Sequence, residues 1–204
     1  SKELKTITGY DRVMIYQFDR EWNGEVVADA REPHLTPFLG LRYPASDIPP
    51  KAREIYQKVW VRSIASVQKE QTFLYPRRNP LTQGRTDLTP VISRAVSPVH
   101  LEYLHNMGAG ASMSIAINIH NKLWGLIACH HYAPKWLSYD EQRSGVMLGQ
   151  IFSGHMTMIL SSQNLQEQSQ IQKVRAKLHQ QMTRSRDLVN GLKEGQQSLM
   201  DVFN

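Results

Sequence analysis

The sequence has 204 residues, of which 41% are apolar, and it carries a formal net charge of +6 at pH 7. This length is enough for one good-sized domain and an extension, and the basic residues form no dense run, which argues against a nucleic-acid-binding protein. Cys129 is the single cysteine, so no internal disulfide can form. No N-terminal signal is visible and no apolar run approaches the ~18 residues that a membrane span needs, so we expect a cytoplasmic protein.

The first third of the chain predicts short strands and one helix. Residues 1–13 indicate a helix that runs into a strand, and residues 11–18 (DRVMIYQF) alternate two faces, as a strand does. Residues 24–30 (GEVVADA) are the expected partner strand. A helix with a proline start is predicted over residues 49–61 (PPKAREIYQKVWV). Residues 68–90, with three prolines and a glycine, predict a long loop.

The hexapeptide PASDIP, residues 44–49, lies before the predicted helix. A proline at each end fixes the backbone dihedral φ and removes a backbone donor. Tyr43 and Ile48, which precede prolines, are pushed toward extended geometry. The segment is therefore stiff, we expect no helix inside it, and it holds the carboxylate of Asp47 in one direction.

The clearest hairpin is predicted over residues 111–132, after a helix over residues 97–108 that ends at Gly108. Met113 and Ile115 share one face of its first strand, and Ser112 and Ser114 share the other. In the returning strand His130 alternates with Cys129, which we interpret as a buried structural thiol. Two serines and a histidine beside an apolar sheet indicate a polar ligand on that face.

A long helix is predicted after residue 138, where Ser138 and Glu141 fit a capping box. The helical pattern continues without a proline to about residue 190. Apolar side chains recur along it at three- and four-residue steps: Ile171, Val174, Leu178, Met182, Val189 and Leu192. Because this stripe is narrow, it favours packing against a partner helix, and we expect a parallel dimer.

Polar residues on several elements suit an acidic ligand. Arginine forks bind carboxylates in a bidentate manner and serine hydroxyls complete such sites; the candidates are Arg62, Arg94, Ser97, Ser112 and Ser114. Four tyrosines, Tyr16, Tyr43, Tyr56 and Tyr103, complete a wide, flat pocket. The sequence has no HExxH, CxxC, GxSxG or phosphate-binding loop. Adjacent histidines such as His130 and His131 point to opposite faces of a strand, which disfavours a metal site.

Four segments resemble the chromophore-binding GAF domain of phytochromes: GYDRVMIYQF, GLRYPASDIPPKAREIY, SPVHLEYLHNMGAGASMSI and KLWGLIACHHY. The resemblance covers residues 8 to about 160. It implies an α/β (α+β) fold, in which helices flank a central antiparallel sheet of about six strands and a long C-terminal helix follows. The implied domains are a bilin-binding GAF domain over residues 1–160, a linker helix over 161–196 and the beginning of a PHY domain over 197–204.

The resemblance also implies a site for a linear tetrapyrrole, or bilin. The backbone carbonyl of Asp47 would accept hydrogen bonds from the pyrrole N–H groups, and His100 would stack beside ring C. The propionate of ring B would be held by Arg62, Arg94 and Ser97, and that of ring C by Ser112 and Ser114. His130 would bind the ring D carbonyl. The remaining positions would line the pigment: Tyr16, Tyr43, Ile48, Pro49, Tyr56, Val99 and Tyr103.

Val99 stands where plant and many cyanobacterial phytochromes have the attaching cysteine. The chain therefore resembles the bacteriophytochrome branch, which uses biliverdin held by a cysteine upstream of a PAS domain. We expect biliverdin, with phycocyanobilin as the alternative, and no covalent bond within this chain.

The implied function is red/far-red light sensing, in which isomerisation at C15–C16 of the bilin signals through a dimeric helix to an output such as a histidine kinase. The implied partners are a second copy, an upstream PAS domain, and downstream PHY and output domains. No kinase motif occurs, so we expect no enzyme activity in this chain. Two alternatives stay open: a GAF domain that binds a cyclic nucleotide, and a pigment-free GAF dimerisation module.

Overall fold

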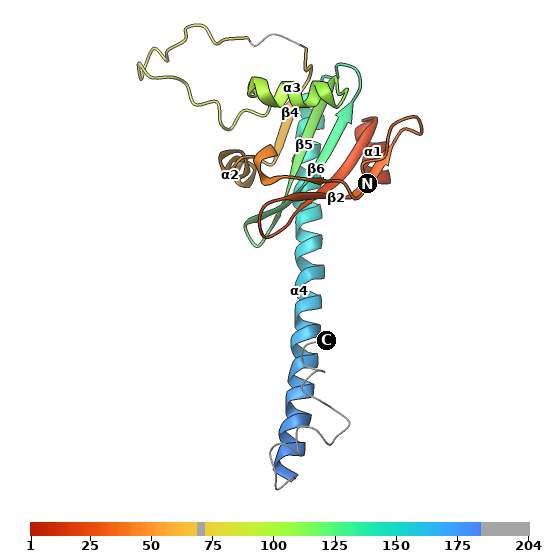
Figure 1. The fold of residues 1–204 in the computed structure, drawn as a ribbon. Helices are drawn as coiled ribbons and strands as arrows, with labels where there is room; N and C mark the ends of the chain where they lie inside the picture. Colours follow the sequence, from red (N-terminus) through yellow and green to blue (C-terminus); the bar gives the residue numbers. More distant parts are fainter. Residues whose placement is uncertain (69–71, 185–204) are drawn as a thin grey trace. The chain divides into compact units, whose positions relative to one another are not determined.

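The computed structural model describes residues 1–68 and 72–184. Its contacts divide the chain into two units, residues 1–154 and 155–204. Within the first unit, six strands form one sheet in the order β3-β2-β1-β6-β5-β4 (Figure 1). The strands are β1 (Arg12–Phe18), β2 (Gly24–Arg31), β3 (Arg42–Tyr43), β4 (Val61–Ile64), β5 (Ala111–Ile119) and β6 (Lys122–His131). All neighbouring strands pair antiparallel, as expected.

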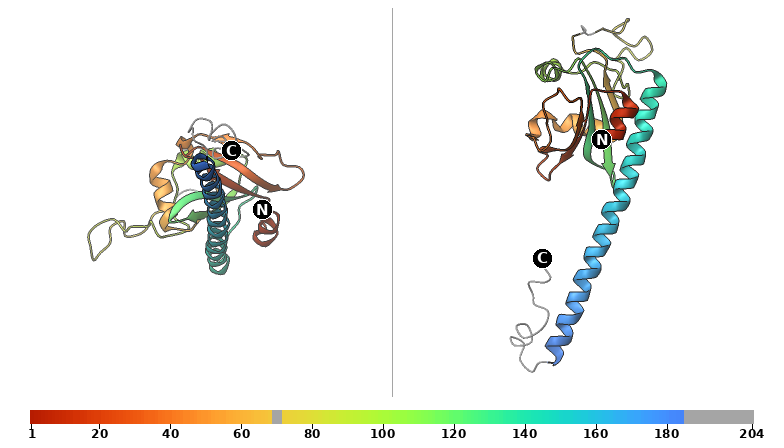
Figure 2. Two further views of the ribbon diagram at one scale, coloured as in Figure 1. Left: turned by 90° about the horizontal axis from the view of Figure 1, so that it is seen from below. Right: turned by 90° about the vertical axis from the view of Figure 1, so that its right-hand side faces the viewer.

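The helices cover both faces of this sheet. They are α1 (Lys2–Thr8), the short 3₁₀ turn η1 (Ala45–Asp47), α2 (Pro50–Lys58), α3 (Pro98–Asn106) and α4 (Tyr139–Arg184). Figure 2 shows α2 and α3 on one side of the sheet and the first turns of α4, within residues 139–154, on the other. Of the second unit, residues 155–184 continue α4.

Alternation along the central strands explains why the sheet is covered on both faces. Met113 pairs with Cys129 and Ile115 with Ile127, and all four are buried. The first turns of α4 approach this face closely. A Cβ atom on Gly149 would lie 2.7 Å from Cγ2 of Ile115, and one on Gly145 would lie 3.4 Å from Cγ2 of Val61. Small residues on α4 therefore bring the helix against β4 and β5.

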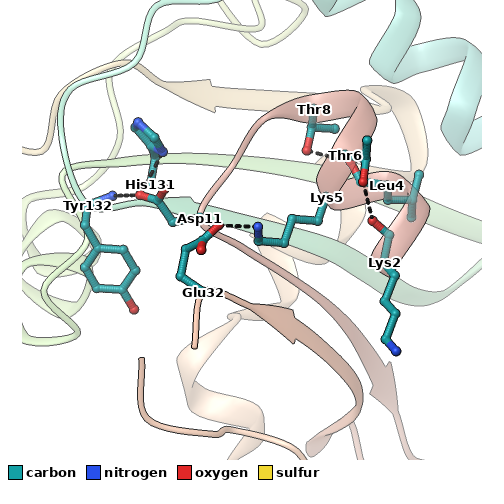
Figure 3. Close-up of polar contacts among 9 residues, drawn as sticks. All are labelled: Lys2, Leu4, Lys5, Thr6, Thr8, Asp11, Glu32, His131 and Tyr132. Atoms are coloured by element: carbon teal, nitrogen blue, oxygen red, sulfur yellow. Dashed lines mark hydrogen bonds and ion pairs between the residues drawn. The ribbon is translucent and has the colours of Figure 1, made fainter. Parts of the chain in front are cut away.

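Polar contacts fasten α1 and the end of β6 to the rest of the sheet (Figure 3). Lys5 of α1 pairs with Glu32, just after β2. The carboxylate of Asp11 accepts a hydrogen bond from the backbone N–H of Tyr132 at 2.8 Å and lies 2.8 Å from Nδ1 of His131. These contacts join segments more than 25 residues apart in the sequence.

Most predicted elements are confirmed. The helix-to-strand start, the helix before Gly108 and the hairpin all form within the predicted segments, and the partner strand continues one residue further than predicted, to Arg31. The capping box is also present, since the N–H of Ser138 donates to Glu141 at 2.7 Å and the N–H of Glu141 donates to the Ser138 hydroxyl at 3.2 Å. Residues 72–90 contain no helix or strand, in agreement with the predicted loop, of which residues 69–71 lie outside the described part.

The prediction differs from the structure around residue 60. The helix predicted over residues 49–61 ends at Lys58, and Val61 begins β4, which was not predicted. The β-branched Val59 and Val61 are both buried while Trp60 between them is only half-buried, which is the two-residue period of a strand. The predictions for Val189, Leu192, residues 185–196 and residues 197–204 lie outside the described residues. Among those described, no helix is long and apolar enough to cross a membrane.

Candidate functional site

Polar side chains of four adjacent strands share the face of the sheet that α2 and α3 cover. Arg62 of β4 lies opposite Ser114 of β5, and Ser112 lies opposite His130 of β6. Tyr16 of β1 lies opposite Leu126 of β6, four residues before His130. Because residues two apart on a strand point to the same face, all of these side chains share one face. The predicted polar face of the hairpin is thus confirmed, and it extends to β1 and β4.

Asp47 ends η1 and lies near three phenols. Its own N–H donates to the carbonyl of Pro44 at 3.1 Å, which closes the turn. The expectation that the hexapeptide contains no helix is therefore wrong, because Ala45–Asp47 form a single 3₁₀ turn between its two prolines. Burial, and after it the negative charge of Asp47, raises the pKa of Tyr16 to about 12. The same two causes act on the pKa of Tyr43 and of Tyr103. The Tyr16 and Tyr43 rings lie 6.0 Å apart. Within the described residues, no donor is hydrogen-bonded to the Asp47 carboxylate.

Two guanidinium groups lie together at the opposite end of this face. Nη2 of Arg62 donates to the carbonyl of Arg94 at 3.4 Å, and Nη1 of Arg94 donates to the carbonyl of Thr89. Burial and the charge of Arg94 lower the pKa of Arg62. Across residues 1–68 and 72–184, neither arginine has a carboxylate within ion-pair distance. Hydrogen bonds from Thr89, and after them the charge of Arg94, lower the pKa of Asp87, but Arg94 and Asp87 do not form an ion pair. Two neighbouring cations without a carboxylate in direct contact among the described residues favour an anionic ligand.

Hydroxyl groups lie beside the arginines. The phenol of Tyr56 on α2 and the hydroxyl of Ser114 share a hydrogen bond, and the charges of Arg62 and Arg94 oppose the rise in the Tyr56 pKa that burial causes. The hydroxyl of Ser97 caps α3 and accepts the N–H of His100 at 3.3 Å. These groups complete a polar surface that includes both arginines.

Two histidines lie between the two ends of the face. The rings of His100 and Tyr103 stack with centroids 6.3 Å apart and planes 9° apart. Burial and the charge of Arg62 lower the pKa of His100. Burial, then Arg12 and His100, lowers the pKa of His130 to about 4, so this imidazole is neutral at pH 7. Nδ1 of His130 is buried and has no hydrogen-bond partner among the described residues, which leaves it free to bind a ligand.

The structure brings most of the predicted site residues to this face at intermediate depth. Ser112 and His130 are buried. The half-buried residues are Tyr16, Tyr43, Asp47, Ile48, Tyr56, Arg62, Arg94, His100, Tyr103 and Ser114. Three predicted residues are exposed: Pro49, Ser97 and Val99. Ile48 packs with Tyr16 and Tyr56 against the core cluster of Phe18, Ala116 and Leu126.

Cys129 lies on the opposite face, as predicted. It pairs with Met113 and is fully buried. Burial raises the pKa of its thiol to about 12, so almost none of it is thiolate at neutral pH. In the described part of the chain, no group of three or more His, Cys, Asp or Glu side chains could hold a metal ion.

Sequence reasoning missed Arg12, which lies on this polar face directly opposite His130. Its guanidinium is 3.1 Å from the carboxylate of Asp29, donates to the carbonyl of Thr36 and lies 3.7 Å from the ring centre of Phe38. The alternation of Arg12, Met14 and Tyr16 along β1 was the available signal, because it places the arginine on the same face as Tyr16.

Comparisons with known proteins agree with this geometry. The GAF domain family matches residues 1–151. Cyanobacterial phytochrome B from Nostoc sp. is 43% identical over 202 residues, which are 99% of this chain and 27% of that protein. A bacteriophytochrome from Xanthomonas campestris is 49% identical over 139 residues, 68% of this chain and 22% of that protein. The chain thus spans about a quarter of the length of these relatives.

Solved structures lead to the same family. The crystal structure of a bacteriophytochrome from the photosynthetic bacterium R. palustris superposes with a TM-score of 0.86 at 32% identity, over 95% of this chain and 39% of that one. A structure of the chromophore-binding domain of an unusual bacteriophytochrome from the same organism gives a TM-score of 0.75 at 37% identity, over 78% and 54%. This chain therefore belongs to the GAF domain family and is homologous to the phytochromes and bacteriophytochromes.

Proposed function

We propose that this chain is the bilin-binding module of a red/far-red photoreceptor and that its pigment is biliverdin. The observation that carries the proposal is the distribution of charge on one sheet face. Asp47, whose carboxylate accepts no hydrogen bond from the described residues, lies among phenols at one end. Arg62 and Arg94, which form no ion pair within residues 1–68 and 72–184, lie at the other. A protonated bilin has the complementary charges, with a delocalised cation in its pyrroles and two propionates.

Asp47 would stabilise the cation. Opposite charge and hydrogen bonding both favour the charged form of an ionisable group. The stiff η1 turn holds the Asp47 carboxylate near Tyr16, Tyr43 and Tyr103. Its backbone carbonyl would accept the pyrrole N–H groups, and His100, with Tyr103 stacked beside it, would lie next to ring C. Ile48 and Pro49 would form the wall beside rings A and B.

The propionates would bind to the polar groups of β4, β5 and α3. Arg62, Arg94 and Ser97 would hold one of them, and Ser112 and Ser114 the other. Ser114 and Tyr56 already share a hydrogen bond, so a carboxylate there would join an existing network. The neutral imidazole of His130, whose Nδ1 has no hydrogen-bond partner in the described part of the chain, would hydrogen-bond ring D beside the tyrosines.

The bilin would be held without a covalent bond inside this chain. The single cysteine, Cys129, is buried on the opposite face with a raised pKa, so its thiol cannot attack a ligand beside Asp47. Val99, the position of the attaching cysteine in other phytochromes, has no nucleophile. We infer attachment through a cysteine upstream of this segment, which favours biliverdin over phycocyanobilin.

When bound, the pigment supplies light absorption and isomerisation at C15–C16. The protein would pass the resulting strain through β5, because Ser112 and Ser114 on the ligand face alternate with Met113 and Ile115, which contact the first turns of α4. The proposed output path is α4, a parallel dimer along it, and PHY and output domains further along the parent chain, including any kinase. We propose a cytoplasmic location for the parent protein.

The test is to express the chain with a biliverdin-producing haem oxygenase and to record absorption before and after red illumination. We expect red absorption that changes reversibly with light. Arg62→Met with Arg94→Met should weaken retention of the pigment by roughly 100-fold or more, since each lost charge-assisted hydrogen bond is worth about 1.5–3 kcal/mol. The matched control is Lys122→Met, an exposed cation at the hairpin turn. A colourless protein that binds a cyclic nucleotide, or one that binds nothing, would favour an alternative function and contradict this proposal.

A further inference from the structure

The turn between β1 and β2 is fixed by the side chains of Asp19 and Asn23. Oδ1 of Asp19 accepts the backbone N–H of Glu21 at 2.8 Å and that of Asn23 at 2.9 Å. Nδ2 of Asn23 donates to Oδ2 of Asp19 at 3.0 Å, and the N–H of Asp19 donates to the carbonyl of Asn23 at 2.8 Å. Because a carboxylate only accepts hydrogen bonds, it fixes which end of the Asn23 amide faces it.

The other end of the Asn23 amide reaches the hexapeptide that contains Asp47. Oδ1 of Asn23 accepts the backbone N–H of Ala45 at 3.2 Å, across 22 residues of sequence. Ala45 is the first residue of η1, and Asp47 is the last. Since η1 is a single short turn, the anchor at Ala45 also sets the direction of the Asp47 carboxylate.

Gly24, the next residue, makes room for the Tyr16 ring. A Cβ atom at this position would lie 1.7 Å from Cζ of Tyr16 and 2.0 Å from its hydroxyl oxygen, so any larger residue must displace the phenol. Gly24 also pairs with Tyr43 of β3, whose ring lies 6.0 Å from that of Tyr16. The glycine therefore determines where the Tyr16 phenol can lie, and with it the contact between the Tyr16 and Tyr43 rings.

We propose that Asn23 and Gly24 are the positioning residues of the bilin site: Asn23 orients Asp47 through the first N–H of η1, and Gly24 places the Tyr16 ring beside Tyr43. The bilin part of this inference rests on the proposed function. Neither residue needs to touch the pigment, because each acts through a group that does.

The test of Asn23 starts with the pigment-free protein. Asn23→Leu keeps the size of the side chain and removes both hydrogen bonds. We expect the Ala45 amide hydrogen to exchange with solvent about ten-fold faster, which corresponds to the loss of one hydrogen bond. We also expect the ring signals of Tyr103 to shift in ¹³C-tyrosine NMR, because Tyr103, although it lies on α3, is close to Asp47. In the loaded protein the absorption maximum should shift. An unchanged Ala45 exchange rate and an unchanged Tyr103 signal would overturn the role of Asn23.

A charge swap separates positioning from general destabilisation. Asn23→Asp keeps an acceptor for Ala45 but sets two carboxylates against each other at Asp19. Asp19→Asn with Asn23→Asp restores the donor, because the amide introduced at position 19 can donate to the carboxylate introduced at position 23, and it conserves the net charge. We expect the double variant to recover the wild-type Tyr103 signals and absorption maximum. A double variant that behaves like Asn23→Asp would contradict the inference. This comparison does not depend on Asn23→Leu, so it decides the question even if Asn23→Leu does not fold.

Gly24 is tested by a double-mutant cycle. Gly24→Ala should shift the ring signals of Tyr16 and Tyr43 and the absorption maximum, whereas in a Tyr16→Leu background the same change should have little further effect. The matched control is Gly154→Ala, where an added Cβ meets nothing within 4 Å. An equal effect of Gly24→Ala in both backgrounds would refute the positioning role. Failure of the wild-type protein to bind bilin would instead refute the proposed function, and the pigment-free measurements would still decide this inference.

Discussion

Replacing Asp29 with asparagine tests whether its buried ion pair with Arg12 stabilises the fold. The Arg12 and Asp29 side chains are 1% and 0% exposed, and their charged atoms lie 3.1 Å apart. The same Asp29 oxygen accepts the N–H of Phe38 at 2.9 Å. The asparagine preserves size and an acceptor oxygen but leaves the Arg12 charge without a counter-ion in the interior.

The expected cost is large for a domain of this size. Removing one partner of a buried ion pair costs about 3–5 kcal/mol, because the remaining charge stays desolvated. We expect about 3 kcal/mol, the lower end of this range, since the introduced amide can still accept a hydrogen bond and Arg12 keeps the Thr36 carbonyl and the Phe38 ring. Total domain stabilities are about 5–15 kcal/mol, so the loss should be easy to measure.

Urea denaturation followed by circular dichroism measures this loss, with Glu25→Gln as the control. Glu25 pairs with Arg42 at 2.9 Å, but the side chains are 40% and 80% exposed, so this change should cost less than about 1 kcal/mol. Arg12→Met with Asp29→Leu should recover most of the loss, because neither variant side chain carries a charge. A loss below about 1 kcal/mol in Asp29→Asn would refute the reasoning.

Three further predictions concern the site and the helix. Val99→Cys, at a position that is 74% exposed, should form a denaturation-resistant adduct with phycocyanobilin, and a pigment that is lost in a denaturing gel would contradict the proposed position of ring A. Because the folded pKa of His130, about 4, lies below its ordinary value of 6.5, the group contributes stability above pH 6.5 that is lost as pH falls toward 4. The loss in free energy of unfolding should reach roughly 3 kcal/mol. The free energy of unfolding of His130→Gln, measured in urea, should depend less on pH than that of the wild type, and an identical pH dependence would contradict this role of His130. Leu178→Glu should lower the mass in solution from dimer toward monomer by light scattering, whereas an unaffected mass would argue against a helical dimer interface.

The sequence predicted the polar face of the sheet best where strand periodicity alone determines the direction in which each side chain points. Ser112 and Ser114 alternate with Met113 and Ile115, and the adjacent strand continues the pattern through His130 and Cys129. A two-residue period within one hairpin needs no information about distant contacts. The prolines of the Asp47 hexapeptide restrict its backbone locally in a similar way, but they did not predict the 3₁₀ turn over Ala45–Asp47.

Other features depend on partners far away in the sequence, which a local pattern does not contain. Strand β4 follows a helical segment directly, and only its pairing with β5 decides that Val61 is extended. The burial of Arg12 depends on Asp29 and Phe38, and the role of Asn23 depends on Ala45. An isolated arginine in a strand or an asparagine in a turn has an ordinary explanation, so neither stood out before the fold brought its partners together.

The two faces of β5 bear on how the proposed light signal could leave the site. Adjacent residues of a strand cannot move independently, because the ladder of hydrogen bonds to β4 and β6 holds the backbone on both sides. A ligand that pulls on Ser112 or Ser114 therefore also moves Met113 and Ile115. These side chains meet α4 at glycine positions, where a Cβ on Gly149 would lie 2.7 Å from Ile115 and leave no space to absorb a displacement. Close packing transmits strain where a loose contact would dissipate it, so β5 would be a direct route from the proposed propionate-binding residues to the helix.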